Sequence, residues 1–241
     1  MRINDPEAVA RQYASEDNLE ARRSLYANVE GPDPRELAIE AVAECHPSRV
    51  LEVGGGPGEL SARIADELGC EVVMVDISAR MVELARGRGV DARVGDTSDL
   101  PFDDASFDCV VAAWMLFHLP DLERGLAELA RVLAPGGRLV AVTNGERHME
   151  ELRAVAGRAA WARTFTRENG AGAIGRYFEQ VVRRDADGWA TIEDDEVVRG
   201  FVASLDADEP IEPGPYELPL RCRRASSVFV ATRVRGESDK P

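Results

Sequence analysis

Short runs of apolar residues alternate with amphipathic segments through the middle of this chain. The runs are rich in valine and apolar on both faces, which predicts strands that are buried on both sides. The segments between them repeat apolar positions every three or four residues, which predicts helices. The predicted strands are Arg49–Val53, 71–75, 92–94, 107–112 and 138–143, and the predicted helices are Glu59–Leu68, 79–88 and 122–133. This alternation is typical of an α/β fold with a mostly parallel sheet and helices on both faces.

The segments before and after this alternating core have other patterns. Residues 5–30 are polar with helical spacing, and a helix is predicted over 34–44 with Asp33 as its N-cap and Pro34 in its first turn. The sequence DADG at 185–188 has the chemistry of a hairpin turn between two strands. The elements predicted beyond Asn144 are helices over 147–177 and 194–205, hairpin strands over 180–184 and 189–192, and a late strand over 226–234.

We therefore expect one domain over residues 1–236, built on a seven-stranded sheet. Residues 1–45 are expected to form an N-terminal helical lid, and residues 48–144 the core that binds a cofactor. Residues 145–236 are expected to supply substrate-side helices and the terminal strands. Residues 237–241 are expected to be a disordered tail.

Composition narrows the classes of function. The chain has a net charge of −15 with acids spread along its length, which disfavours a nucleic-acid partner. It has neither an apolar run of about 18 residues nor an N-terminal signal pattern, so we expect a cytoplasmic protein without a membrane span. The four cysteines are scattered without a CxxC pair, as in a chain without disulfides. Lys240 is the only lysine, which excludes a Schiff-base lysine from the folded core.

A glycine-rich turn, in VLEVGGGPGEL (residues 50–60), directly follows the first strand of the core. A strand, a glycine-rich turn and a helix form the first unit of nucleotide-binding α/β folds, because glycine permits positive φ and close approach of a ligand. The dinucleotide pattern GxGxxG does not fit here, since Pro57 or Glu59 stands where a glycine is required. The spacing that fits is an acid followed by GxGxG, at Glu52, Gly54, Gly56 and Gly58.

This pattern resembles the first motif of the class I S-adenosylmethionine-dependent methyltransferases of the small-molecule type. Three later landmarks are similar to that family in order and spacing: Asp76 at the end of the second strand, Gly95-Asp96 after the third, and LAPGGRLV at 133–140 before the fifth. The resemblance spans residues 48–144. It implies a Rossmann-like methyltransferase fold, S-adenosylmethionine as cofactor and S-adenosylhomocysteine as product.

The resemblance also implies roles for individual residues. The glycines would leave room for the methionine arm, Glu52 would help to hold its ammonium group, Asp76 would bind the ribose hydroxyls, and Asp96 the adenine amine. The full expected cofactor set is Glu52, Gly54, Gly56, Gly58, Asp76, Ile77, Asp96, Thr97 and Ala113. Structural alternatives stay open, because Asp76 could cap the following helix and Asp96 could hold a turn.

The substrate is expected beyond the carboxyl ends of the fourth and fifth core strands. Trp114, Met115 and Phe117 there indicate an apolar or aromatic wall. The segment has neither the Asn/Asp-Pro-Pro-aromatic box of base-amino methyltransferases nor the acid of magnesium-dependent ones, so we predict no metal. His118 and His148 are the candidate general bases, since imidazole titrates near neutral pH. The expected substrate contacts are Tyr13, Trp114, His118, Asn144 and His148.

Three functions are compared. The first is an O- or N-methyltransferase of secondary metabolism, acting on a small, largely apolar or aromatic molecule as a monomer or homodimer. The second is a protein that binds S-adenosylmethionine without transferring methyl, such as a cyclase. The third is an oxidoreductase, which the missing third glycine disfavours. Small molecules are the only partners expected.

Overall fold

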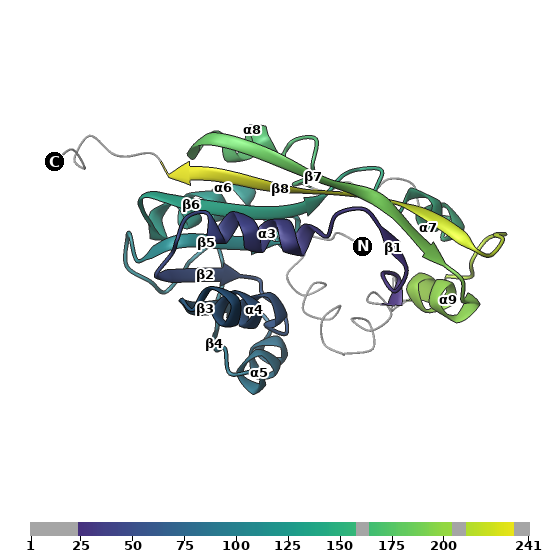
Figure 1. Cartoon of the computed structure of the whole chain (residues 1–241), viewed down its shortest axis with the longest axis horizontal. Coiled ribbons are helices and arrows are strands. Elements are labelled where there is room, and N and C mark those ends of the chain that lie inside the picture. Colours follow the sequence, from purple (N-terminus) through teal and green to yellow (C-terminus); the bar gives the residue numbers. More distant parts are fainter. Residues whose placement is uncertain (1–23, 158–163, 204–210, 234–241) are drawn as a thin grey trace.

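The computed structural model describes residues 24–157, 164–203 and 211–233. Its centre is an eight-stranded sheet in the order β1-β7-β8-β6-β5-β2-β3-β4 (Figure 1). Neighbouring strands from β4 to β6 pair in parallel, whereas β6–β8, β8–β7 and β7–β1 pair antiparallel. The strands are β1 (Val29–Glu30), β2 (Arg49–Val53), β3 (Glu71–Asp76), β4 (Asp91–Val94), β5 (Phe107–Ala113), β6 (Leu133–Asn144), β7 (Phe178–Ile192) and β8 (Leu220–Arg233). The predicted mostly parallel α/β sheet is confirmed.

Helices cover both faces of this sheet. They are α3 (Pro34–Ala43), α4 (Glu59–Leu68), α5 (Ala79–Gly87), α6 (Leu122–Val132), α7 (Glu150–Val155), α8 (Gly170–Ile174) and α9 (Asp195–Ala203), with a 3-10 turn η1 (Leu116–His118). On one face, Val42 of α3 and Ile64 of α4 join a core with valines of β2, β5, β6 and β8. On the other face, Leu126 of α6 and Ile174 of α8 join a second core with Phe229 of β8. β2, β3 and β5 are therefore buried on both sides, as their unbroken apolar runs predict, whereas the edge strand β4 is exposed at three of its four residues. None of the helices within the described ranges is long and apolar enough to cross a bilayer.

Polar side chains begin three of these helices. The predicted N-cap Asp33 accepts a hydrogen bond from the backbone N–H of Arg35 at 2.8 Å. Ser78 caps α5, and Asp121 caps α6 by accepting from the Arg124 N–H at 3.0 Å. Such caps satisfy amide groups that have no partner inside the helix. They explain why the predicted and observed starts of α3, α5 and α6 coincide.

The predicted hairpin at residues 185–188 is wrong. β7 passes through this segment as one strand and pairs with β8 beyond it, so that Asp187 lies opposite Ala225 and Gly188 opposite Arg224. Long-range pairing with β8 has therefore overridden a local sequence that is typical of turns.

Two contacts explain why turn-forming residues are accommodated in this strand. Asp185 accepts a hydrogen bond from Ser227 Oγ at 2.7 Å and pairs with Arg167 at 3.0 Å, so its charge is neutralised at the sheet. A Cβ atom on Gly188 would lie 1.9 Å from the Glu30 carbonyl oxygen. Glycine is therefore required there for the close approach of β1, and not for a turn.

The flanking segments differ from prediction in further ways. The expected lid contains the edge strand β1 near its end, and this strand makes the sheet eight-stranded rather than seven-stranded. Helix α3, which also falls within the expected lid, packs on one face of the sheet, and residues 1–23 lie outside the described residues. The segment predicted as helical over 147–177 contains two short helices, α7 and α8, in its described part. The late strand begins at Leu220 because it pairs with β7 far beyond the end of β6.

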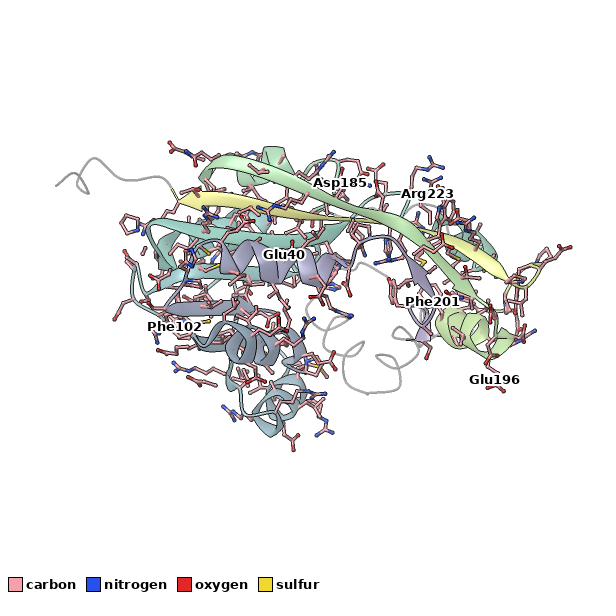
Figure 2. All side chains as sticks on the ribbon, viewed as in Figure 1. Glu40, Phe102, Asp185, Glu196, Phe201 and Arg223 are labelled. Atoms are coloured by element: carbon pink, nitrogen blue, oxygen red, sulfur yellow. The ribbon has the colours of Figure 1, made fainter. Side chains whose placement is uncertain are left out.

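β7 and β8 extend past the carboxyl ends of the parallel strands (Figure 1). There, Leu25, α7, α9 and the ends of the two long strands bury a third apolar cluster. Phe201 of α9 belongs to this cluster, whereas Glu196 of the same helix is exposed and points away (Figure 2). In Figure 1, α4 and α5 lie beside β2, β3 and β4, whereas α7 and α9 of this cluster lie beyond the carboxyl ends of the parallel strands.

Candidate functional site

The glycine turn after β2 has three residues in the left-handed region, Gly54, Gly56 and Gly58, with φ of +62°, +56° and +78°. A Cβ atom at Gly54 would lie 2.6 Å from Met115 Cβ, and one at Gly58 would lie 2.6 Å from Ala85 Cβ. These two glycines allow close packing within the protein. A Cβ at Gly56 would meet no atom of the described residues within 4 Å. Gly56 therefore borders open space at the carboxyl edge of β2.

Glu52 lies beneath this turn and is only 2% exposed. Its carboxyl accepts a hydrogen bond from Ser61 Oγ of α4. Burial raises the pKa of Glu52 to about 7; the Ser61 bond opposes this shift and the negative charge of Asp76 adds to it. A substantial part of this group is therefore protonated at neutral pH.

Asp76 ends β3 beside the same turn. One carboxylate oxygen accepts from the Gly56 N–H at 2.9 Å, and the other accepts from the Ser78 N–H at 2.8 Å. Burial raises the pKa of Asp76, although both amide bonds act in the opposite direction. These bonds orient the carboxylate, and each oxygen keeps a second lone pair that can accept from a ligand.

The other predicted cofactor residues lie near the ends of β3, β4 and β5. Asp96 is exposed and accepts a hydrogen bond from the Ser98 N–H at 2.8 Å. This contact holds the turn after β4, which is the structural role that the sequence left open for Asp96. Thr97 is buried, and Ala113 is half-buried at the end of β5. Ile77 is 46% exposed, which is unusual for a large apolar residue and leaves its side chain available to cover an apolar ligand.

Trp114 and Asn144, both predicted to line the substrate side, are in direct contact. Trp114 Nε1 donates to Asn144 Oδ1 at 3.1 Å, and Ser226 Oγ of β8 lies 2.8 Å from the same oxygen. Trp114 has a φ of +54°, which is rare for a bulky side chain and is found more often at functional sites. The Arg35 guanidinium of α3 lies 5.8 Å from the centre of the indole ring. The ends of β5 and β6 are thus joined to β8 by side chains.

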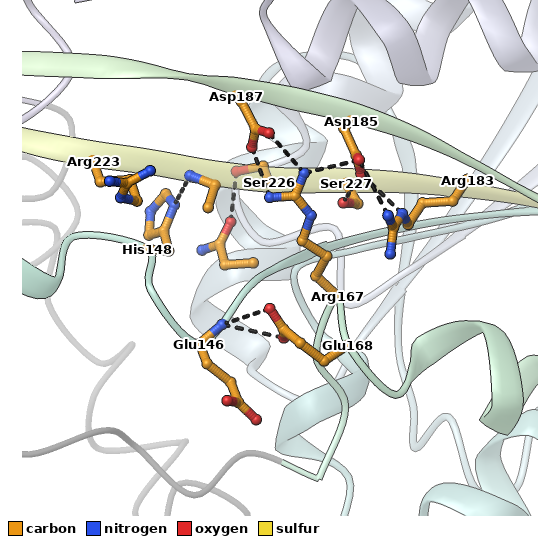
Figure 3. Close-up of polar contacts among 12 residues, drawn as sticks. Glu146, His148, Arg167, Glu168, Arg183, Asp185, Asp187, Arg223, Ser226 and Ser227 are labelled. Atoms are coloured by element: carbon orange, nitrogen blue, oxygen red, sulfur yellow. Dashed lines mark hydrogen bonds and ion pairs between the residues drawn. The ribbon is translucent and has the colours of Figure 1, made fainter.

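His148 is buried, and both of its ring nitrogens are in hydrogen bonds, of which Figure 3 shows the one to the backbone of β8. The backbone N–H of Ala225 donates to Nδ1 at 3.1 Å, and Nε2 lies 3.1 Å from the hydroxyl of Tyr26. Ala225 adjoins Ser226, so this pair lies next to the contact between Trp114 and Asn144. His118, half-buried at the end of η1, has its ring 4.4 Å from that of Phe117. Tyr13, the remaining predicted substrate contact, lies outside the described residues.

A polar cavity of about 310 Å³ adjoins this edge. It is lined by Arg147, Arg167, Glu168, Asp187, Gly188, Trp189, Arg223, Arg224 and Ala225. Figure 3 shows Arg167 paired with Asp185 and Asp187, while Glu168 accepts from the Glu146 N–H. Arg147 and Arg223 both pair with Glu150. Four of the charged side chains that line the cavity are arginines and two are acids, so its lining carries an excess of positive charge, which Glu150 and Asp185 partly neutralise. A second cavity, about 390 Å³, lies beside Asp195 and Tyr216, away from the glycine turn.

Several residues of this site were not singled out from the sequence. Ser61 is a polar residue on the buried face of the amphipathic helix α4. A polar residue at such a position indicates a buried polar partner, and this was the signal that could have identified it. Ser226, Arg35 and the packing of Met115 against Gly54 have no local signal, because their partners are distant in the sequence. Among the described residues, no three His, Cys, Asp or Glu side chains are grouped so that they could hold a metal ion.

Comparisons with known proteins agree with this geometry. The sequence model of a family described as "Methyltransferase domain" matches residues 51–141. Over 113 residues, the chain is 39% identical to a demethylmenaquinone methyltransferase of Thermus thermophilus, with 44% of this chain and 51% of that protein covered. Over 128 residues, it is 34% identical to a ubiquinone/menaquinone biosynthesis C-methyltransferase of Cellvibrio japonicus, with 49% and 51% covered. The chain thus spans about half the length of the curated relatives it matches.

A solved structure from Thermotoga maritima has a similar fold. It is described as a SAM-dependent methyltransferase and possible histamine N-methyltransferase, and it superposes with a TM-score of 0.54 at 25% identity. The match covers 83% of this chain and 89% of that one. The likeness therefore extends over the sheet and its flanking segments, beyond residues 51–141.

Proposed function

The chain carries a methyltransferase domain of the class I S-adenosylmethionine-dependent type, and on this premise we propose that the protein transfers a methyl group from S-adenosylmethionine to a small molecule. The observation that carries this proposal is the open space beside Gly56, next to the oriented carboxylate of Asp76. Both residues belong to the segment that matches the methyltransferase domain.

The residues around this space fit a sulfonium nucleoside. The bare Cα of Gly56 leaves room for a ligand, and the aligned oxygens of Asp76 can accept from two ribose hydroxyls. We assign the adenine amine to Asp96 and the face of the adenine ring to Ile77, since both side chains are exposed. We assign to Glu52 the support of the turn from below, since it is almost completely buried and bonded to Ser61. S-adenosylmethionine, when bound, supplies an electrophilic methyl group.

We further propose that the acceptor atom is carbon, in an electron-rich hydroxylated aromatic ring. The names of the curated relatives support carbon, because they are methyltransferases of demethylmenaquinone and one is described as a C-methyltransferase. The expectation of an oxygen or nitrogen acceptor is thereby replaced as the first choice. A quinone ring is electron-poor, so the nucleophile would be its reduced, dihydroxylated form. The indole of Trp114 and the amide of Asn144 offer an aromatic surface and a polar group to such a ring.

The protein's contribution to this reaction is alignment, exclusion of water and removal of a proton. Met115 and Phe117 are buried behind Trp114 and keep this side of the edge apolar. Methylation at carbon leaves a ring proton to be removed, so a base is useful. We propose His118, at the end of η1 and half-buried, for that role.

Replacement of Asp76 by alanine tests the cofactor site. We expect Asp76→Ala to weaken S-adenosylhomocysteine binding by about 100-fold, since two charge-assisted hydrogen bonds would be lost. Calorimetry with the purified protein measures this change. The matched control is Asp91→Ala at the amino end of β4, where the carboxylate pairs with Arg93 on the surface; its binding should stay within about twofold of wild type. Equal binding by the two variants would contradict the assignment.

Turnover separates methyl transfer from the non-methylating alternative. The proposal requires that S-adenosylhomocysteine appear in the presence of acceptor and that the product gain the mass of one methyl group. A reduced, short-chain demethylmenaquinone is the first acceptor to be offered. Cofactor binding with a changed acceptor but no S-adenosylhomocysteine would favour a cyclase-type activity instead. Binding of NAD in place of S-adenosylhomocysteine would favour an oxidoreductase.

A further inference from the structure

The hydrogen bonds of His148 determine where its proton lies. A backbone N–H can only donate, so Nδ1, which receives the Ala225 N–H at 3.1 Å, carries no proton. In a neutral imidazole the proton is then on Nε2, and Nε2 donates to the Tyr26 hydroxyl oxygen at 3.1 Å. The one nitrogen that could accept a proton is therefore occupied by the main chain of β8. This arrangement is unsuited to a general base, which must direct an unprotonated nitrogen at the substrate.

The same contacts fix the position of the Tyr26 side chain. Its neighbour Leu25 is 3% exposed and is anchored in the apolar cluster between α7 and α9. The chain then enters β1, where Val29 and Glu30 pair with Ala190 and Trp189 of β7. Tyr26 itself is 38% exposed, so the phenol is held by its hydroxyl and its backbone while part of the ring stays accessible.

This phenol lies on the substrate side of the site. His148 follows the carboxyl end of β6 by four residues, and its partner Ala225 adjoins Ser226, which is bonded to Asn144 beside Trp114. The segment that carries Tyr26 continues into α3, whose Arg35 lies over the Trp114 ring. Tyr26 is thus linked to Trp114 in two ways. One runs through His148 and the adjoining residues Ala225 and Ser226 to Asn144, and the other runs along the chain to Arg35.

We propose that the Tyr26 hydroxyl contacts the acceptor molecule, and that His148 is a positioning residue which holds this hydroxyl through its Nε2–H and does not act as the base. This inference rests on the proposed methyltransferase function. The phenol oxygen accepts from His148, and in the proposed complex its own O–H donates to a ring oxygen of the acceptor.

The tautomer is tested by NMR, without reference to activity. The chain has three histidines, so ring-nitrogen spectra of histidine-labelled protein are simple, and His148→Gln assigns the signals of His148. At pH 7 we expect a protonated Nε2 and an unprotonated Nδ1, with an Nε2 proton that exchanges at least tenfold faster in Tyr26→Phe. Exposed His46 is the internal control and should show averaged tautomers. A proton on Nδ1, or an Nε2 proton unaffected by Tyr26→Phe, overturns the proposal.

Substitutions then separate a positioning residue from a base. Glutamine retains an N–H near the position of Nε2 but cannot act as a base at neutral pH. With the reduced demethylmenaquinone probe, Tyr26→Phe and His148→Ala should each lower kcat/KM about tenfold, the double variant no further, and His148→Gln less than threefold. Tyr216→Phe, which removes another tyrosine hydroxyl, one bonded to Asp195 of α9, is the matched control and should leave kcat/KM unchanged.

The outcomes distinguish this inference from the proposed function. Equal losses in His148→Gln and His148→Ala identify His148 as a base and overturn the inference. Additive losses in the double variant overturn it as well, because the two residues would then act independently. S-adenosylhomocysteine binding should stay within twofold of wild type in every variant. If the wild-type protein methylates no probe, the proposed function fails, whereas the NMR measurement still decides the state of His148.

Discussion

At the scale of single residues, the carboxyl group of Glu52 shows how the fold changes the chemistry of a side chain. Its pKa is raised from 4.5 to about 7, chiefly because burial disfavours the charged form. The folded state therefore binds more protons than the unfolded state between these two values. The stabilising contribution of this group is full below pH 4.5 and is lost as the pH rises to about 7.

Glu52→Gln removes this pH dependence. The amide is neutral at every pH and can keep a hydrogen bond to Ser61, so the variant should gain stability relative to wild type as the pH rises. From the shift in pKa, the difference in free energy of unfolding should grow by about 3 kcal/mol between pH 4.5 and 8. Denaturant unfolding at both pH values measures it. Glu40→Gln, on the solvent side of α3 (Figure 2), is the control, and its stability relative to wild type should not change with pH. If the stability of Glu52→Gln relative to wild type were also independent of pH, the raised pKa of Glu52 would be contradicted.

Gly56→Ala tests whether the open space beside the glycine turn belongs to a ligand. Alanine at a φ of +56° costs about 1 kcal/mol of stability, and its Cβ projects into that space. We expect at least a tenfold loss of S-adenosylhomocysteine affinity by calorimetry. Gly69→Ala, at a φ of +65° after α4 and also without neighbours within 4 Å, should cost similar stability with no loss of affinity. Similar affinities in the two variants would argue that the space is not a binding site.

At the scale of elements, β7 is placed by its partners on both sides. It joins β8 to the edge strand β1, and it carries Asp185 into contact with Arg167 and Ser227. The close approach of β1 at Gly188 holds the segment that leads to Tyr26. The position of the phenol therefore depends on an unusual backbone contact far from the glycine turn.

Gly188→Ala should disturb this contact. The new Cβ would lie 1.9 Å from the Glu30 carbonyl oxygen, so β1 must move or detach. We expect a loss of about 1–3 kcal/mol in the free energy of unfolding, as for other overpacked sites, and faster hydrogen exchange at residues 28–30. Gly172→Ala in α8, where a Cβ meets nothing, should leave stability equal or slightly higher. Unchanged exchange in β1 would show that this contact does not hold the strand.

At the scale of the whole molecule, the carboxyl edge is assembled from three parts of the chain. The parallel core supplies the glycine turn, Asp76 and Trp114; the segment before α3 supplies Tyr26; and β8 supplies the backbone and Ser226. A ligand at this edge should therefore stabilise the folded molecule as a unit.

Thermal unfolding measures that stabilisation. S-adenosylhomocysteine at 100 times its dissociation constant should add about 2.7 kcal/mol to the free energy of unfolding. For a chain of this size the melting temperature would rise by about 5–10 °C. NAD at the same concentration should produce no rise. An equal rise with both ligands would contradict the specificity inferred from the GxGxG spacing.

The sequence by itself determined the parallel core, the starts of helices α3 to α6 and the position of the glycine turn. These features follow from local patterns: runs of valine that can only be buried, cap residues beside helix starts, and glycines where the chain must reverse. Because parallel strands end at the same edge, placing Glu52, Asp76 and Asp96 together required only the strand order of an α/β fold.

Only the tertiary structure decided what depends on partners distant in the chain. A strand replaces the hairpin predicted at 185–188 because β8 and β1 pair on either side of it. Of the four glycines in the turn, Gly56 alone meets no described residue, which depends on where Met74, Ala85 and Met115 pack. His148 and Tyr26 are 122 positions apart, so no local pattern could reveal their bond. The tautomer of His148 is set by the N–H of Ala225, 77 positions away in β8. Such contacts are fixed by how the elements are assembled, and not by the residues on either side of them in the sequence.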